Sequence, residues 1–247
     1  MSSTELTIVA TRRPDLLAST MESFQARLLK NFDVSRVSIN IDPLWGDAQD
    51  EAACCAILRR YYPDCVIYTP EKPGFAAAVE RLWSNTKSDV IFHLEDDWNL
   101  AEDIDPSILG FFADPSVTEI SLMCKEKNWD IQKRGAYHFA KVKHRLFGVE
   151  LPFYRKVPSF TLSPSFLRGD FARRWANLMD MTLDPEKQVR SRQNQPLTTY
   201  VSEYRNYVHT GRDVYNIAVD IGRDWRDKRN IEKTIINGTS HWSPAAS

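Results

Sequence analysis

The sequence has no long hydrophobic run and no recognisable export signal. None of its apolar stretches approaches the roughly 20 residues that a helix needs to cross a bilayer. Residues 1–10 lack the basic start and the extended apolar stretch of a secretory signal. Both absences predict a cytoplasmic protein with at most peripheral membrane association.

Cysteine is scarce, and several common motifs are missing. The four cysteines include no pair with the two-residue spacing of a zinc or redox site, so we expect free thiols in a reducing compartment. The chain also lacks a GxxxxGK loop, a GxGxxG after its first apolar run and a GxSxG turn. These absences disfavour P-loop, dinucleotide-dependent and serine-hydrolase chemistry.

Neither sign of charge dominates the chain. Its 32 basic and 33 acidic residues leave a net charge of −1, so no global field attracts nucleic acid, and we expect no nucleic-acid partner. With 247 residues, 43% of them hydrophobic, the chain is long enough to bury a sizeable core in one large domain.

Two alternating patterns occupy the first hundred residues. Short apolar runs at 6–10, 37–41, 66–68 and 90–94 alternate with stretches of helical periodicity at 17–28, 49–61 and 75–83. Strands and helices that alternate in this way form a parallel sheet with right-handed crossovers. The carboxyl ends of the strands then share one edge, and open α/β sheets bind ligands at that edge.

The pattern after residue 98 is less regular. We expect strands at 119–124 and 160–166, a helix at 169–181, and mixed loops with short helices from 188 onwards. The segment 125–156 carries nine Lys or Arg against three acidic residues and is interleaved with aromatic side chains. Such a segment suits the stacking of sugars or the binding of an anionic acceptor. His93, within a predicted strand, is expected to be a hydrogen-bonded core residue and not a metal ligand.

The strand at 90–94 ends in three consecutive carboxylates, Glu95-Asp96-Asp97. Their mutual repulsion is relieved if a divalent cation binds among them. Mg²⁺ and Mn²⁺ accept one or two carboxylates together with phosphate oxygens and water, which points to a diphosphate ligand. The alternatives are a solvated acidic turn or acidic caps for a following helix.

Four segments at this predicted edge, at 11–17, Asp42, 72–78 and 94–97, follow one another in a familiar order and spacing. Residues 6–98 resemble the nucleotide-diphospho-sugar binding half of GT-A glycosyltransferases, most closely the family-2-like enzymes. The resemblance implies a Rossmann-like α/β fold, with a mostly parallel central sheet, helices on both faces and a C-terminal acceptor-side region. Residues 1–125 would form the nucleotide-sugar binding half, and 126–247 the acceptor-side and C-terminal region of the same domain.

The resemblance also implies roles on the donor side. Thr11 and Arg13 would line the nucleotide pocket at the end of the first strand, and Asp42 would hydrogen-bond the base. Gly74 would let the chain pass close to the nucleotide, with an ordinary helix-entry glycine as the alternative.

The acidic triplet resembles the EDD variant of the DxD motif found in N-acetylglucosaminyltransferases. Asp97 would bind Mn²⁺ or Mg²⁺ directly, while Glu95 or Asp96 would reach the ribose or a metal-bound water. In many relatives a C-terminal histidine or aspartate contacts the metal, and Asp220 stands at a position where they often have the histidine.

The second half of the chain supplies the candidates for the general base and for further phosphate-binding cations. The segment 184–188 resembles the acceptor-side segment of inverting relatives, which makes Glu186 the candidate general base and Asp184 the reserve; a capping acid before a helix is the alternative. Arg223 and Lys228 suit phosphate oxygens, since a guanidinium offers a fork of donors and an ammonium a compact charge. A solvated helix face is the alternative for that run.

The function implied is a metal-dependent, inverting glycosyltransferase. It would move a sugar from a nucleotide-diphospho-sugar donor to a glycan, glycolipid or other hydroxyl acceptor, as in the biosynthesis of bacterial surface polysaccharides. Two alternatives stay open. One is a sugar-phosphate nucleotidyltransferase, although the loop after the first strand lacks the glycine-rich, lysine-bearing signature of that class. The other is a non-catalytic protein that binds sugar nucleotides or glycans.

Overall fold

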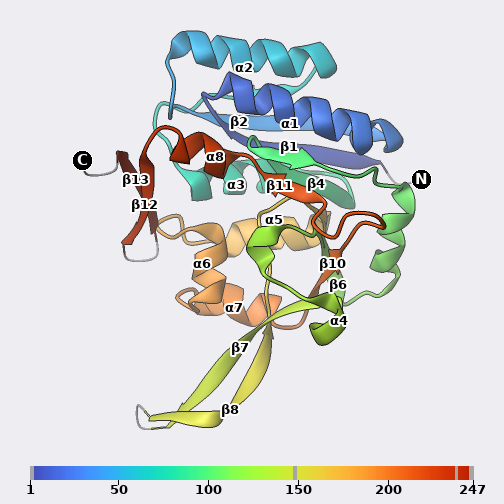
Figure 1. Ribbon diagram of the computed structural model, residues 1–247, viewed down its shortest axis with the longest axis vertical. Helices are drawn as coiled ribbons and strands as arrows, with labels where there is room; N and C mark the ends of the chain where they lie inside the picture. Colours follow the sequence, from blue (N-terminus) through green and yellow to red (C-terminus); the bar gives the residue numbers. More distant parts are fainter. Residues whose placement is uncertain (1–2, 147–148, 237–238, 245–247) are drawn as a thin grey trace.

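The computed structural model describes residues 3–146, 149–236 and 239–244. Within these residues the centre of the molecule is a nine-stranded sheet with the strand order β3-β2-β1-β4-β9-β6-β10-β7-β8 (Figure 1). One end of this sheet is built by the first hundred residues, and the other end extends into a long hairpin that projects from the body.

The first part of the chain forms parallel strands joined by helices. The strands are β1 (Thr4–Thr11), β2 (Val34–Asp42), β3 (Val66–Tyr68) and β4 (Val90–Glu95). The helices that connect them in turn are α1 (Pro14–Arg27), α2 (Ala48–Tyr61) and α3 (Phe75–Ser84). The predicted alternation of strands and helices is confirmed.

Local sequence signals explain where these helices begin. Pro14 occupies the first turn of α1, where its missing N–H leaves no intrahelical bond unmade. α2 begins after Asp47, whose carboxylate accepts hydrogen bonds from the backbone N–H groups of Gln49 and Asp50. The Asp50 carboxylate in turn accepts from the Asp47 N–H at 3.0 Å, which completes a capping box.

The second part of the chain extends the same sheet. Its strands are β6 (Val117–Leu122), β7 (Tyr137–Leu146), β8 (Val149–Pro158), β9 (Ser165–Arg168) and β10 (Arg205–His209). Strand β9 lies antiparallel between β4 and β6, whereas β10 is parallel to β6. The predicted parts 1–125 and 126–247 therefore share one sheet. The helices of this part are α4 (Ile131–Arg134), α5 (Gly169–Leu178), α6 (Pro185–Arg190) and α7 (Gln195–Val201).

Some boundaries in this part differ from the sequence-based expectation. The strand expected at 160–166 spans only Ser165–Arg168, because the backbone N–H groups of Thr161 and Leu162 are bound by the carboxylates of Glu119 and Glu186 and not by a strand. The basic segment 125–156 contributes the hairpin of β7 and β8. The tail, expected to hold loops and short helices, also contains strands, and one of them, β10, pairs with β6 in the central sheet.

Helices cover both faces of the sheet, as the resemblance implies. On one face, alternate residues of β1 such as Leu6 and Ile8 pack with α1 and α2 around Phe24. On the other face, Val9 packs with α3, α5, α6 and α7 around Trp83 and Trp175. This division follows from the period of two residues in a strand, which sends successive side chains to opposite faces.

Small elements close the edge at which β1 and β4 end. Strand β5 (Trp98–Leu100) pairs with β11 (Ala218–Asp220) in an antiparallel ribbon, and α8 (Gly222–Asp227) follows directly. Beyond α8, β12 (Ile231–Ile236) and β13 (Thr239–Pro244) form a separate two-stranded sheet. A 3₁₀ turn at Leu29–Asn31 connects α1 to β2, and another at Pro106–Ala113 connects β5 to β6.

Predictions about single side chains can be compared with these elements. His93 is fully buried in β4, where its Nδ1 accepts a hydrogen bond from the indole N–H of Trp83 at 3.1 Å, so it is a core residue as expected. All four cysteines are free thiols. Among the described residues, no helix combines the length and apolar character that crossing a membrane requires.

Candidate functional site

The candidate site lies where β1 and β4 end side by side. The chain leaves β1 toward β2 on one side and returns from β3 to β4 on the other, so the strand order reverses between β1 and β4. Ligands of open α/β sheets bind in the crevice at such a reversal. The register pairs Val9 with Glu95, and the Asp96 N–H donates to the Val9 carbonyl at 3.0 Å. The acidic triplet therefore emerges directly beside Thr11 and Arg13.

Asp96, the middle residue of the triplet, points into the protein. Its Oδ2 accepts hydrogen bonds from the backbone N–H of Thr11 at 2.8 Å and from the Thr11 hydroxyl at 3.1 Å. Its Oδ1 is 2.6 Å from Nη2 of Arg13, and both side chains are buried. Burial alone would lower the pKa of Arg13, but the charges of Asp96 and Asp97 outweigh it and raise that pKa. The Arg13 guanidinium is therefore a permanent buried cation at the edge of the sheet.

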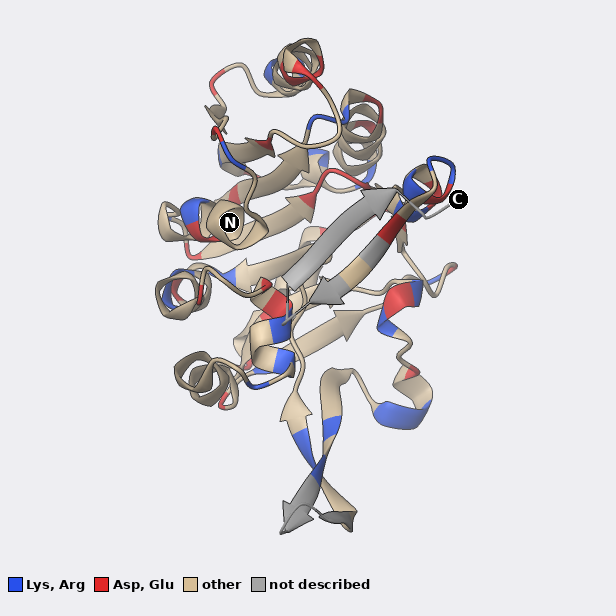
Figure 2. Ribbon diagram, turned by 90° about the vertical axis from the view of Figure 1, so that its left-hand side faces the viewer, with Lys and Arg blue, Asp and Glu red and all other residues tan. Residues whose placement is uncertain are grey.

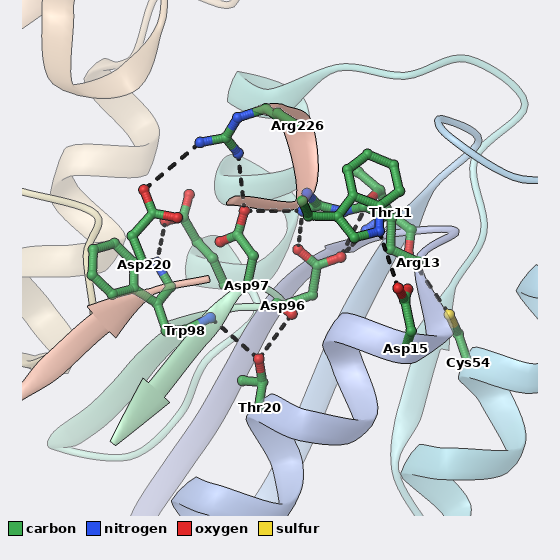
Figure 3. Close-up of polar contacts among 12 residues, drawn as sticks. Thr11, Arg13, Asp15, Thr20, Cys54, Asp96, Asp97, Trp98, Asp220 and Arg226 are labelled. Atoms are coloured by element: carbon green, nitrogen blue, oxygen red, sulfur yellow. Dashed lines mark hydrogen bonds and ion pairs between the residues drawn. The ribbon is translucent and has the colours of Figure 1, made fainter. Parts of the chain in front are cut away.

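Asp97 lies between two arginines. Its Oδ2 is 3.1 Å from Nη2 of Arg13 and 3.4 Å from Nη1 of Arg226 (Figure 3). Arg226 also reaches the carboxylate of Asp220, with 3.7 Å between Nη2 and Oδ2. One guanidinium thus bridges two carboxylates that lie far apart in the sequence. Asp220 reaches this position because β11 pairs with β5, in a register that places Asp220 opposite Trp98.

Gly222 allows α8 to approach the acidic triplet closely. A Cβ atom at this position would lie 2.1 Å from Oδ2 of Asp97, closer than any real contact. The backbone N–H groups of Ile221 and Gly222 also point to the Asp97 carbonyl, at 2.9 and 3.3 Å. The first turn of α8 therefore packs against Asp97 only because residue 222 has no side chain.

The two cations predicted for phosphate lie differently from Arg226. Arg223 is 59% exposed and lies 3.7 Å from Glu126 and 3.9 Å from Asp220, while Lys228 is exposed after the end of α8. Arg226, only 17% exposed, is the residue of this segment that faces both carboxylates. Sequence reasoning missed it. The available signal was the spacing of four between Gly222 and Arg226, which places them on one helix face.

Glu186 lies on the same acidic side of the site. Its Oε1 accepts a hydrogen bond from the Thr161 hydroxyl at 2.9 Å and another from the Leu162 N–H. The pKa of Glu95 is raised well above its ordinary range by burial and by the charge of Asp97, and the charge of Glu186 adds to this effect. Asp184, the reserve base, instead forms an ion pair with Lys187 in the first turn of α6.

Asp42 and Gly74 lie together on the other side of β1. The buried Asp42 carboxylate accepts from Nδ2 of Asn40 at 2.7 Å and from the Gly74 N–H at 2.9 Å. Gly74 has an extended backbone, with φ of −172°, and a Cβ atom there would be 3.4 Å from its nearest neighbour, the Cβ of Ala77. Any residue could adopt this conformation, so the helix-entry role needs no glycine. The Asp42 contact fixes the start of α3 against the end of β2.

The carboxylates near Arg226 have the right chemistry for a hard cation. Glu95, Asp97 and Asp220 offer only oxygen ligands, which Mg²⁺ and Mn²⁺ prefer. Within the described residues, however, no three such side chains are gathered into a ready ligand set. Arg226 lies between Asp97 and Asp220. In Glu95, Oε2 already accepts a hydrogen bond from the Trp98 indole N–H at 3.0 Å. The carboxylates have the chemistry that a divalent ion needs, but Arg226 occupies the space between Asp97 and Asp220 in this structure.

Comparison with solved structures shows what kind of fold this is. No protein-family model and no curated protein sequence matches the chain. The mannosyltransferase PcManGT from Pyrobaculum calidifontis, solved with GDP-Man and Mn²⁺, aligns with a TM-score of 0.56 at 11% identity over 91% of this chain. GalNAc-T7, solved with UDP, GalNAc and Mn²⁺, aligns with a TM-score of 0.55 at 9% identity over 89% of this chain.

A third structure belongs to a different enzyme class. CMP:2-keto-3-deoxy-manno-octonic acid synthetase, solved with CTP, aligns with a TM-score of 0.51 at 13% identity over 92% of this chain. The alignments span 60% of the mannosyltransferase, 43% of GalNAc-T7 and 97% of the synthetase. At such identities the likeness shows the fold alone. The chain therefore has the GT-A type of α/β fold, which it shares with these two glycosyltransferases and in broad outline with the synthetase.

Proposed function

We propose that this protein is a glycosyltransferase that takes a sugar from a nucleotide-diphospho-sugar and passes it to a hydroxyl group of a glycan, glycolipid or related acceptor. The observation that carries the proposal is the meeting of Arg13, Asp97, Asp220 and Arg226 at the reversal point of the sheet. Cations and acids interleaved there suit a diphosphate. The shared fold with two glycosyltransferases, both solved with Mn²⁺, supports the same reading.

The arginines serve the donor. The buried cation of Arg13 cannot lose its proton, and its fork of donors suits phosphate oxygens. Arg226, which is less buried and pairs with Asp97 and Asp220, would turn toward a diphosphate when the donor binds. Both groups would neutralise the negative charge that develops on the leaving nucleoside diphosphate.

The carboxylates of Asp97 and Asp220, with Glu95 beside them, would hold Mn²⁺ or Mg²⁺. When bound, such an ion supplies Lewis-acid stabilisation of the leaving diphosphate. Thr11, whose N–H and hydroxyl fix Asp96, keeps the triplet aligned with the end of β1.

Glu186 is proposed as the general base of an inverting displacement. Thr161 and Leu162 both donate to Oε1, so the orientation of the carboxylate is fixed and Oε2 is the oxygen available to an acceptor hydroxyl. The base would take the hydroxyl proton while the acceptor oxygen attacks the sugar. The four free thiols support a reducing, cytoplasmic location for this reaction.

The decisive experiment offers the protein a panel of sugar nucleotides with candidate acceptors and measures the released nucleoside diphosphate. Release from one donor, which Mn²⁺ or Mg²⁺ enhances and Asp97→Asn abolishes, supports the proposal. If no donor yields a diphosphate although nucleotides bind, the protein is a sugar-nucleotide binding protein.

A nucleotidyltransferase is the second candidate, because the synthetase aligns over 97% of its own length. That class would consume a nucleoside triphosphate and a sugar or sugar phosphate, and release pyrophosphate. A pyrophosphate assay with the four common nucleoside triphosphates separates the two candidates. Against this reading, the loop after β1 reads Thr-Arg-Arg-Pro and carries no glycine-rich, lysine-bearing signature.

A further inference from the structure

Two adjoining cavities lie below the candidate base, between the body-side end of the hairpin and helices α6 and α7. The first has a volume of about 250 Å³ and is lined on one wall by Arg155, Lys156 and Arg192. The second is lined by Glu186, Arg190 and Arg192 among others. The two share Arg192, Val157 and Pro158, and Glu186 lines the second, whose volume is about 20 Å³; the two cavities together are called the path.

Four of the five charged residues that line the path are basic, and Glu186 is the exception. In the portion of the chain that the structure describes, no Asp or Glu forms an ion pair with Arg155, Lys156, Arg190 or Arg192. Figure 2 shows basic segments along the hairpin near this region. Uncompensated cations that line a concavity attract an anion, because the surrounding low-dielectric walls focus their field.

Arg192 shows the clearest sign of a missing ligand. Its Nε is buried and has no hydrogen-bond partner. A buried charged donor without a partner is costly, so such groups are usually satisfied by protein, water or ligand. Its backbone φ of 60° lies in the left-handed region that non-glycine residues rarely adopt. The left-handed conformation follows from the end of α6, where the Arg192 N–H bonds the Val189 carbonyl at 3.1 Å. The unpartnered Nε is explained if the guanidinium binds an oxyanion.

A neighbouring histidine reports the same positive field. The pKa of His138, on β7, is lowered to about 3, chiefly by burial and then by the charges of Lys127 and Arg190. Arg190 on α6 therefore adds to the positive potential near β7, alongside the cations of the hairpin.

We propose that this path binds an oxyanion, a phosphate or carboxylate, that belongs to the acceptor, so that the acceptor is negatively charged. The assignment of the anion to the acceptor rests on the proposed function, since it depends on Glu186 as the base. The guanidinium N–H groups of Arg192 donate hydrogen bonds to the anion, and the charges of Arg155 and Lys156 neutralise it. The attacking hydroxyl of the acceptor lies at Glu186.

Calorimetric titration with three small probes tests this inference: a sugar 1-phosphate, a uronic acid and a neutral methyl glycoside. We expect one or both anionic probes to bind, with the neutral glycoside at least about tenfold weaker. The comparison of the phosphate and the carboxylate identifies which oxyanion the site prefers. Equal binding of the neutral glycoside would overturn the inference.

Variants locate the binding to this path. Arg192→Gln is expected to weaken the anionic probe about tenfold, and Arg155→Gln on the exposed part of β8 to weaken it several-fold. Arg59→Gln, an exposed cation of α2 on the far side of the sheet, is the matched control and should bind the probe like the unaltered protein. Thermal unfolding confirms that each variant is folded. Unchanged probe affinity in both Arg192→Gln and Arg155→Gln would contradict the assignment.

The outcome is separable from that of the proposed function. Release of a nucleoside diphosphate without any anionic probe binding would overturn the acceptor inference and leave the glycosyltransferase standing. Probe binding that depends on Arg192, in a protein that releases no diphosphate from any donor, would keep the anion site and remove its assignment to an acceptor.

Discussion

Arg13 and Asp96 form a buried ion pair, with 2.6 Å between Nη2 and Oδ1, that joins the loop after β1 to the end of β4. The Thr11 backbone and hydroxyl complete the environment of this carboxylate. Asp96 thus has a clear structural task, while its neighbour Asp97 faces the arginine of α8. The triplet is therefore a set of three acids in three different environments.

Replacing Asp96 by Asn should destabilise the protein strongly. The change would leave the buried Arg13 cation without its main partner, and breaking one side of a buried pair costs about 3–5 kcal/mol. Chemical denaturation measures the free energy of unfolding. The matched control is Asp103→Asn, because Asp103 pairs with Arg27 at 3.6 Å and their side chains are 65% and 44% exposed, respectively. It should cost about 0–1 kcal/mol. A loss for Asp96→Asn as small as that of the control would contradict the structural role.

Replacing Arg226 by Gln should have opposite effects on two ligands. Without the guanidinium between Asp97 and Asp220, Mn²⁺ alone should bind more tightly, by a factor on the order of ten, because a competing cation is gone. A nucleoside diphosphate in the absence of metal should bind more weakly, because a phosphate contact is lost. Calorimetry measures both affinities directly and needs no turnover.

The control for this experiment is Arg223→Gln. Arg223 also lies near Asp220, at 3.9 Å, but it is largely exposed, so its replacement should change the Mn²⁺ affinity by less than about twofold. An unchanged Mn²⁺ affinity in Arg226→Gln would contradict the proposal that Arg226 and the metal compete for the same carboxylates.

Replacing Glu186 by Gln should lower turnover and spare the donor. A missing general base costs a factor on the order of 10² or more, while nucleotide affinity should stay within about twofold. Steady-state kinetics and calorimetry measure the two quantities. Asp184→Asn is the companion variant, because Asp184 lies in the same turn and is paired with Lys187. A large loss in that variant, with Glu186→Gln active, would transfer the role of base to Asp184.

His93 should make stability depend on pH. Its pKa is lowered by burial from 6.5 to about 3. Between these values the unfolded chain binds a proton that the folded protein does not, so stability is full above about pH 6.5 and falls as the pH decreases. From pH 7 to pH 4.5 this residue should remove about 2–3 kcal/mol.

The variant His93→Gln isolates that contribution. Glutamine keeps an acceptor for the Trp83 indole but cannot be protonated, so its unfolding free energy should decline less steeply with acid. Denaturation curves at several pH values give the difference between the two proteins. Parallel profiles for the two proteins would mean that His93 is not the responsible group.

The first hundred residues could be predicted closely, and physical reasons explain why. Each strand and helix there is encoded by local periodicity, and local caps such as Asp47 set the boundaries. The parallel connections then bring Thr11 and Glu95 to one edge without further information.

The later parts of the site depend on contacts distant in sequence. Arg226 reaches Asp97 only because β11 pairs with β5, more than a hundred residues away, and short strands carry little signal of their partner. The hairpin of β7 and β8 could not be predicted from the sequence either, because charged and aromatic residues alternate in it without a clear buried face. The roles of Glu186, Asp42 and the other site residues stay predictions.

Strand β9, from the second half of the chain, is hydrogen-bonded to β4 on one side and to β6 on the other. The edge proposed for the donor and the path proposed for the acceptor therefore lie on one continuous sheet. A hinge between two lobes would have to break this backbone ladder, which makes a clamshell motion too costly. Substrates would therefore be enclosed by rearrangement at the rim, where α8 and the hairpin lie outside the rigid centre.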